Sequence, residues 1–95
     1  MVYFKAKWKH SFDNEPVWFY SELDDARWEL RKVEVYQDGR KNFASAHEKI
    51  GTDLSEKPIP PSAEIASQPE FEVYDTSKEE FERVWGERFS SGRTG

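Results

Sequence analysis

The amino-acid sequence predicts an α+β domain, a four-stranded, mainly antiparallel meander sheet with a C-terminal amphipathic helix packed on one face. Three observations support this fold class. Residues 2–10 alternate between apolar and polar side chains, as a half-buried strand does. An Asp-Gly pair at 38–39 indicates a hairpin, and residues 76–79 have the Thr-x-x-Glu pattern of a helix capping box.

Length and composition limit how this domain is built. The chain has 95 residues, of which we expect 1–89 to form a single domain and 90–95 to be a disordered tail. Fifteen residues are aromatic, against three Leu, three Ile and one Met, so ring packing must supply much of the buried apolar area. The absence of cysteine excludes disulfides, thiolate nucleophiles and thiolate zinc sites.

Charge is distributed unevenly along the chain. The formal net charge is -5; residues 1–49 carry nine acids and nine bases, whereas residues 50–95 carry ten acids and five bases. No stretch approaches the roughly 18 apolar residues of a membrane span, and the N-terminus lacks the apolar core of a signal peptide. We therefore expect a cytoplasmic protein with no membrane partner.

The first three strands follow from alternation and turn residues. Residues 2–10 place even-numbered side chains on one face and odd-numbered ones on the other. The second strand is predicted at 17–20, ahead of a polar corner at 21–25, and the third at 27–36. Apolar residues of the third strand fall out of phase, so either both sheet faces are covered or a bulge lies near 31–32.

Burial chooses the register of the hairpin that follows. A two-residue loop would set Phe43 opposite Glu34. A three-residue loop at 37–39, with its glycine in a left-handed conformation, sets Phe43 opposite Val33. We favour the three-residue loop because it groups apolar side chains, and it begins a fourth strand at 41–46.

Residues 47–70 are expected to wrap the edge of the sheet. The first part, 47–61, is predicted to be a loop because it contains a glycine and three prolines among polar residues. A short helix is predicted at 61–66. Residues 71–74 are either a short edge strand or an extended lead-in to the last helix.

That last helix is predicted to begin at Thr76, where the capping box places Glu79 at the third helical position. Apolar residues then recur at the spacing of one helix face. They are Phe81, Val84, Trp85 and Phe89. This amphipathic pattern is typical of a helix docked on a sheet.

Seven sequence blocks together form a distinctive pattern: Trp8-x-His10, Glu15-Pro16, Tyr20-Ser21-Glu22-Leu23-Asp24, Arg27-Trp28-Glu29-x-Arg31-Lys32-Val33-Glu34, Asp38-Gly39, Pro58-Ile59-Pro60-Pro61 and Lys78-Glu79-Glu80-Phe81. This pattern resembles a small bacterial family of unknown function, DUF6881. The resemblance covers about residues 3–85, and the segment 40–43 departs from it by being more basic. It implies a bacterial or phage origin and a stand-alone domain, and it carries over no catalytic residues.

The segment from 18 to 31 is the first candidate site, because it combines rings with charges of both signs. The candidate interaction surface is Trp18, Tyr20, Glu22, Asp24, Asp25, Arg27, Trp28, Glu29 and Arg31. Trp, Tyr and Arg are enriched at binding hot spots. The alternative interpretation is core packing for the rings and an ion-pair lattice for the charges. An exposed ring framed by acids would mark an interface.

From size, acidity and the lack of catalytic motifs we predict a non-catalytic protein-binding domain. Such a chain could serve as an immunity or antitoxin-like inhibitor that docks on a basic protein by electrostatic steering. No enzyme activity and no cofactor are expected.

A basic aromatic stripe on the first strand offers an alternative function, nucleic-acid binding. Its residues are Tyr3, Lys5, Lys7 and Lys9. Rings together with cations on a sheet form stacking platforms for bases. The ordinary interpretation of the same stripe is a solvated sheet face with cross-strand ion pairs.

A second alternative is a small enzyme or ligand-binding domain with a pocket near His10. There His10 would act as a base oriented by Asp13, Glu15 or Glu22, and Ser21 would be the nucleophile. Ser21 lacks the flanking glycines of a nucleophile elbow. No metal site is expected, because His10 and His47 lie far apart and have no metal-ligand spacing.

Overall fold

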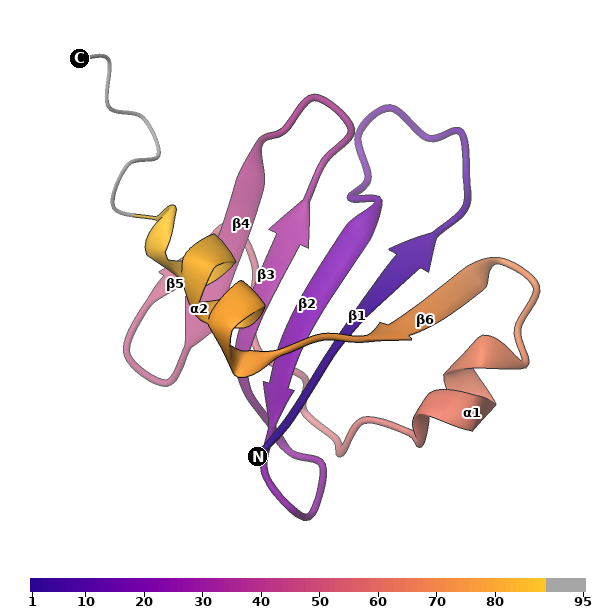
Figure 1. Ribbon diagram of the computed structural model, residues 1–95. Coiled ribbons are helices and arrows are strands. Elements are labelled where there is room, and N and C mark those ends of the chain that lie inside the picture. Colours follow the sequence, from indigo (N-terminus) through magenta and orange to yellow (C-terminus); the bar gives the residue numbers. More distant parts are fainter. Residues whose placement is uncertain (89–95) are drawn as a thin grey trace.

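The computed structural model describes residues 1–88 as an α+β domain built on one six-stranded sheet (Figure 1). The strands pair antiparallel in the spatial order β5-β4-β3-β2-β1-β6. The elements are β1 (Val2–Trp8), β2 (Trp18–Leu23), β3 (Glu29–Val35), β4 (Lys41–Ser45), β5 (Lys49–Ile50), α1 (Ser62–Ala66), β6 (Phe71–Asp75) and α2 (Lys78–Gly86).

The prediction of four strands was wrong by two. The strands β1 to β4 follow one another as a meander, but β5 adds outside β4 and β6 pairs with β1 at the opposite edge (Figure 1). The open choice at residues 71–74 is thus decided for an edge strand, paired from Phe4 opposite Asp75 to Trp8 opposite Phe71. The two residues of β5 are too few to show any periodicity in the sequence.

The hairpin between β3 and β4 has the predicted register. Val33 lies opposite Phe43. The backbone N–H of Tyr36 donates to the carbonyl of Arg40 at 2.8 Å and closes a three-residue loop. Gly39 in this loop has φ 93°, a conformation that glycine adopts without steric cost. The three-residue loop is therefore confirmed.

The irregularity of the third strand is a bulge, placed slightly earlier than predicted. Glu22 lies opposite Arg31, but its neighbour Leu23 lies opposite Glu29, so Leu30 is the extra residue. The second strand also runs further than expected, to Leu23. Its polar residues at 21 and 22 resembled a corner because their buried partners could not be recognised from the sequence.

Both faces of the sheet carry a hydrophobic core. On the face that bears α2, one buried cluster contains Val33, Phe43, Phe81, Val84 and Trp85. On the opposite face a second cluster contains Phe4, Ala6 and Leu23, against which Ile59 and Ile65 pack. Because side chains alternate along β1, its odd-numbered residues lie on the α2 face and its even-numbered residues on the opposite face.

The final helix begins one residue later than predicted. Ser77 is the N-cap, and its hydroxyl accepts a hydrogen bond from the backbone N–H of Glu80 at 3.0 Å. Thr76 instead donates to the Glu80 carboxylate. Two adjacent hydroxyl residues each have a glutamate three positions on, so the sequence pattern fits both. The predicted helix-face residue Phe89 and the tail at 90–95 lie outside the described residues.

Candidate functional site

The nine residues predicted as one interaction surface lie in different parts of the fold. Trp18 and Tyr20 lie on the α2 face, and Lys5 is placed between their rings, 5.6 and 5.9 Å from the centroids. Glu22 and Arg31 pair with each other near α2, and Glu29 is buried on the opposite face. The remaining four residues, Asp24, Asp25, Arg27 and Trp28, lie in the connection between β2 and β3.

Arg31 joins the sheet to α2 through two carboxylates. Its Nε and one terminal nitrogen donate to the two oxygens of Glu22, each at 2.7 Å, and both terminal nitrogens donate to Glu82 at 3.0 and 2.6 Å. The hydroxyl of Tyr3 donates to Glu22 at 2.7 Å. We call these four residues the Arg31 cluster. It ties three strands to the helix, so its role is structural.

The environment of the Arg31 cluster shifts the pKa values of its members. Hydrogen bonds from Arg31 lower the pKa of Glu22 and of Glu82, because they favour the ionised carboxylates. Burial, and then the bond to Glu22, raise the pKa of Tyr3 to about 12. At neutral pH the cluster therefore contains one cation, two anions and a protonated tyrosine.

Glu29 is a buried carboxylate on the opposite face of the sheet, where its side chain is 2% exposed. It accepts hydrogen bonds from the Ser21 hydroxyl at 3.0 Å and from the backbone N–H of Ser55 at 2.9 Å, and the ammonium of Lys32 lies 3.3 Å away. Ser21 thus donates its hydroxyl proton to Glu29. It does not donate to His10, the base considered for it from the sequence.

Trp28 is the exposed ring within the predicted surface, with 44% of the residue accessible. It lies at the end of a tight connection in which the Asp24 carboxylate accepts from the backbone N–H groups of Ala26 and Trp28, each at 2.9 Å. A further bond runs from the Asp24 N–H to the Trp28 carbonyl at 3.0 Å. Exposed Asp25 lies three residues before Trp28 in the chain, so the exposed ring has an acidic neighbour in the sequence.

Arg27 fixes the same connection from the other side. It has φ 67°, the left-handed region that a non-glycine residue rarely adopts. Its guanidinium donates to the carbonyls of Ile59 and Pro60 at 2.8 and 2.7 Å, and its own carbonyl accepts from the Ile59 N–H at 2.8 Å. These three bonds over-determine the strained backbone. No sequence pattern marks this anchor, because its partners are backbone groups more than thirty residues away.

The basic aromatic stripe of β1 is interrupted by acids. Tyr3 belongs to the Arg31 cluster, and Lys5 forms an ion pair with Glu80 of α2 at 3.0 Å. The Lys9 ammonium lies 3.8 Å from the Glu72 carboxylate. Lys7 is exposed, and its ammonium lies 6.0 Å from the centroid of the Trp18 ring. The stripe therefore does not present a continuous positive surface.

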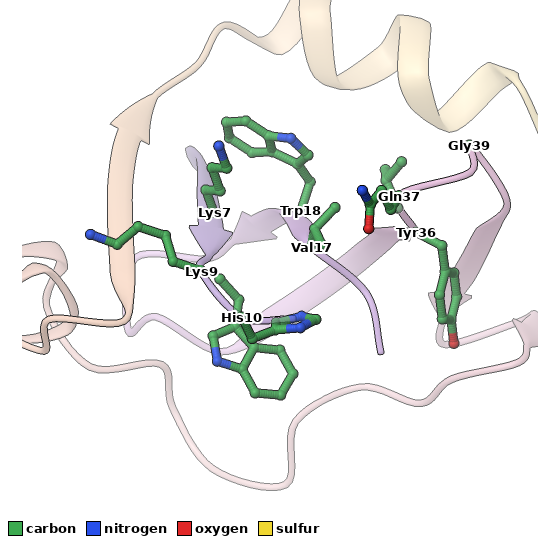
Figure 2. Close-up of a pocket in the computed structure, with 10 residues that line it drawn as sticks. Lys7, Lys9, His10, Val17, Trp18, Tyr36, Gln37 and Gly39 are labelled. Carbon is green, nitrogen blue, oxygen red and sulfur yellow. The ribbon is translucent and has the colours of Figure 1, made fainter. Parts of the chain in front are cut away.

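A cavity of about 620 Å³ lies at the ends of β1, β2 and β3, and His10 is among its lining residues (Figure 2). Figure 2 shows Lys7 and Trp18 on the side where α2 runs and His10 on the other side, while Lys9 and Tyr36 extend away from the centre. The polar groups that line the cavity thus do not converge on one point.

Backbone groups hold the His10 ring. The ring nitrogen Nε2 lies 2.8 Å from the Pro16 carbonyl, and Nδ1 accepts from the Phe12 N–H at 2.9 Å, so the proton is on Nε2. Glu22, one of the three acids considered as its orienting partner, hydrogen-bonds to Arg31 and Tyr3 instead. The alternative in which Glu22 orients His10 is therefore wrong. Among residues 1–88 there is also no group of three or more His, Asp or Glu side chains that could hold a metal ion.

The fold and these sites define a small single-sheet α+β domain with a core on each face of the sheet. A family model described as a domain of unknown function, DUF6881, matches residues 2–90, and the chain therefore belongs to this family. No curated protein and no solved structure matches the chain. No helix within residues 1–88 has the length and apolar character needed to cross a membrane.

Proposed function

We propose that this chain is a non-catalytic protein-binding domain whose contact surface is centred on Trp28. The observation that carries the proposal is a tryptophan that is 44% exposed and whose backbone N–H and carbonyl are both hydrogen-bonded. Tryptophan is enriched among the residues that dominate binding energy. A side chain whose backbone is already ordered also loses less conformational freedom when a partner covers it.

The surrounding charge supports a basic partner. Asp24 and Asp25 lie within four residues of Trp28, and the chain has a net charge of -5. Acidic groups beside an exposed ring accelerate association with a positively charged surface. These properties fit an immunity or antitoxin-like inhibitor that neutralises a basic protein in the bacterial cytoplasm. Nucleic-acid binding through β1 has less support, because Lys5 and Lys9 are each paired with a glutamate.

Affinity purification from the native host tests this proposal with three immobilised proteins: the natural chain, Trp28→Ser and Phe12→Ser. Phe12 is a suitable control because it is 59% exposed and lies in a different connection, where it stacks on His10. We expect the natural chain and Phe12→Ser to retain the same basic protein in stoichiometric amount, and Trp28→Ser to lose it.

A titration with labelled single-stranded DNA at two salt concentrations completes the test. If no retained protein depends on Trp28, or if the DNA binds with a steep loss of affinity at higher salt, the proposal is wrong. Weak DNA binding that both ring variants share equally would agree with a sheet whose lysines are engaged with acids.

A further inference from the structure

A groove of about 460 Å³ lies on the sheet face opposite α2, a volume within the usual range of small-molecule sites. Apolar side chains of β1, β2, β6 and the segment that crosses this face form most of its lining. They are Phe4, Ala6, Phe19, Phe71, Ile59, Pro60 and Ile65. The groove is thus a part of the second core that the chain leaves unfilled.

One side of the groove is polar. Ser21 of β2, with Glu29 and Lys32 of β3, also lines it, and Ser21 and Glu29 are both buried. The Ser21 hydroxyl donates its proton to Glu29, so its oxygen can only accept a further hydrogen bond. The Lys32 ammonium donates one hydrogen bond to the Asp53 carbonyl at 2.7 Å and lies 3.3 Å from the Glu29 carboxylate. This side of the groove is therefore suited to accept a hydrogen bond from a ligand.

The charges at this polar side already cancel. The Glu29 carboxylate faces the Lys32 ammonium, and within residues 1–88 no buried side-chain nitrogen or oxygen lacks a hydrogen-bond partner. A charged group brought into the groove would lose its water without gaining a free counter-charge. A neutral group that donates one hydrogen bond meets no such penalty.

We propose that this groove binds a neutral, mainly apolar small molecule that carries one hydrogen-bond donor, such as an alcohol, a phenol or an arylamine. The apolar body lies over Ala6 and Phe19, and the donor faces Ser21. The site is separate from the proposed protein-binding surface, because Trp28 does not line the groove. The failure of one proposal would therefore not contradict the other.

The first test uses N-phenyl-1-naphthylamine, a neutral fluorescent probe with two ring systems and a single N–H donor. We expect saturable binding at one site per chain with a blue-shifted emission. 1-Octanol should displace the probe, and octanoate, which has the same chain length but a charged end, should do so at least about tenfold less well. No saturable binding, or equal displacement by both competitors, would overturn the proposal.

Three variants locate the probe. Ala6→Leu fills the floor of the groove, and Gln68→Trp places a ring at an exposed lining position where folding is not at risk. Lys7→Leu adds similar apolar bulk on the other face of the same strand and is the matched control. We expect the first two to weaken binding about tenfold or more, since each removes space for several apolar atoms. Binding that Gln68→Trp leaves unchanged, or that Lys7→Leu weakens equally, would place the probe elsewhere.

Discussion

The guanidinium of Arg31 forms a two-pronged pair with the carboxylate of Glu22, with both nitrogen–oxygen distances at 2.7 Å. The two residues lie opposite each other in β2 and β3, immediately beside the bulge at Leu30. Without the bulge, the pairing of Leu23 with Glu29 would continue with Glu22 opposite Leu30. The extra residue brings Arg31 opposite Glu22 instead. From there Arg31 also reaches Glu82 of α2 and covers the ring of Phe81, 4.9 Å from its centroid.

Arg31→Ala should therefore destabilise the fold strongly. The substitution leaves the nearly buried Glu22 carboxylate without its cation, and we expect a loss of about 2–3 kcal/mol in unfolding free energy. Urea denaturation measures it. Arg40→Ala removes an exposed ion pair with Asp38 and should cost far less, because solvent screens exposed pairs. Equal effects of the two substitutions would contradict the structural role of the Arg31 cluster.

Acid should weaken the fold through the same cluster. The folded-state pKa values of Glu22 and Glu82 lie below the ordinary 4.5, so the unfolded chain takes up protons first as the pH falls. The stabilisation is complete well above pH 4.5 and is lost as the pH drops through the lower folded-state values. Urea midpoints measured from neutral to acid pH should show this decline. In Arg31→Met the decline should be shallower, and an unchanged slope would count against this assignment.

Two glycines with left-handed backbones should tolerate alanine differently. Gly51 has φ 82°, and a Cβ atom there would overlap the side chain of Asn42, whose Cγ lies 2.7 Å from that position. Gly39 has φ 93° but open space around it. We expect Gly39→Ala to cost about 1 kcal/mol from backbone strain alone, and Gly51→Ala to cost at least about 1 kcal/mol more. Thermal and urea unfolding of both variants would show the order, and the reverse order would refute it.

At Arg27 glycine should destabilise the fold less than alanine does, which is the reverse of their usual order. Both substitutions remove the guanidinium bonds to Ile59 and Pro60, but glycine relieves the strain of φ 67° whereas alanine keeps it. Arg27→Gly should therefore be more stable than Arg27→Ala by about 1 kcal/mol. Equilibrium unfolding compares them directly. If alanine is the more stable, the left-handed conformation at this position is not maintained in solution.

The fold was predictable wherever neighbouring residues determine it. Alternation in β1 and the loop before β4 were sufficient for the meander and for the pairing of Val33 with Phe43. The edge strand β6 was ambiguous, because its strand character depends on pairing with β1 near the other end of the chain. The start of α2 was wrong by one residue, because Thr76 and Ser77 offer the same capping chemistry.

The candidate sites were less predictable than the fold, because they depend on distant contacts. Glu22 and Glu29 look alike in the sequence, yet one pairs with Arg31 beside α2 and the other is buried on the opposite face. The anchoring of Arg27 to two carbonyls left no trace in residue type. The acids near Trp28 could be recognised from the sequence, and its role in binding stays a prediction.

The position of β1 has a consequence for the order of folding. This first strand occupies an interior place in the sheet, between β2 and β6, and its pairing with β6 brings Phe4 opposite Asp75. The hairpins from β1 to β4 need only short loops to close, whereas β6 must return across most of the chain. We therefore expect strands β1 to β4 to pair early in folding. The strand β6 should pair with β1 later, because that contact joins residues far apart in the chain.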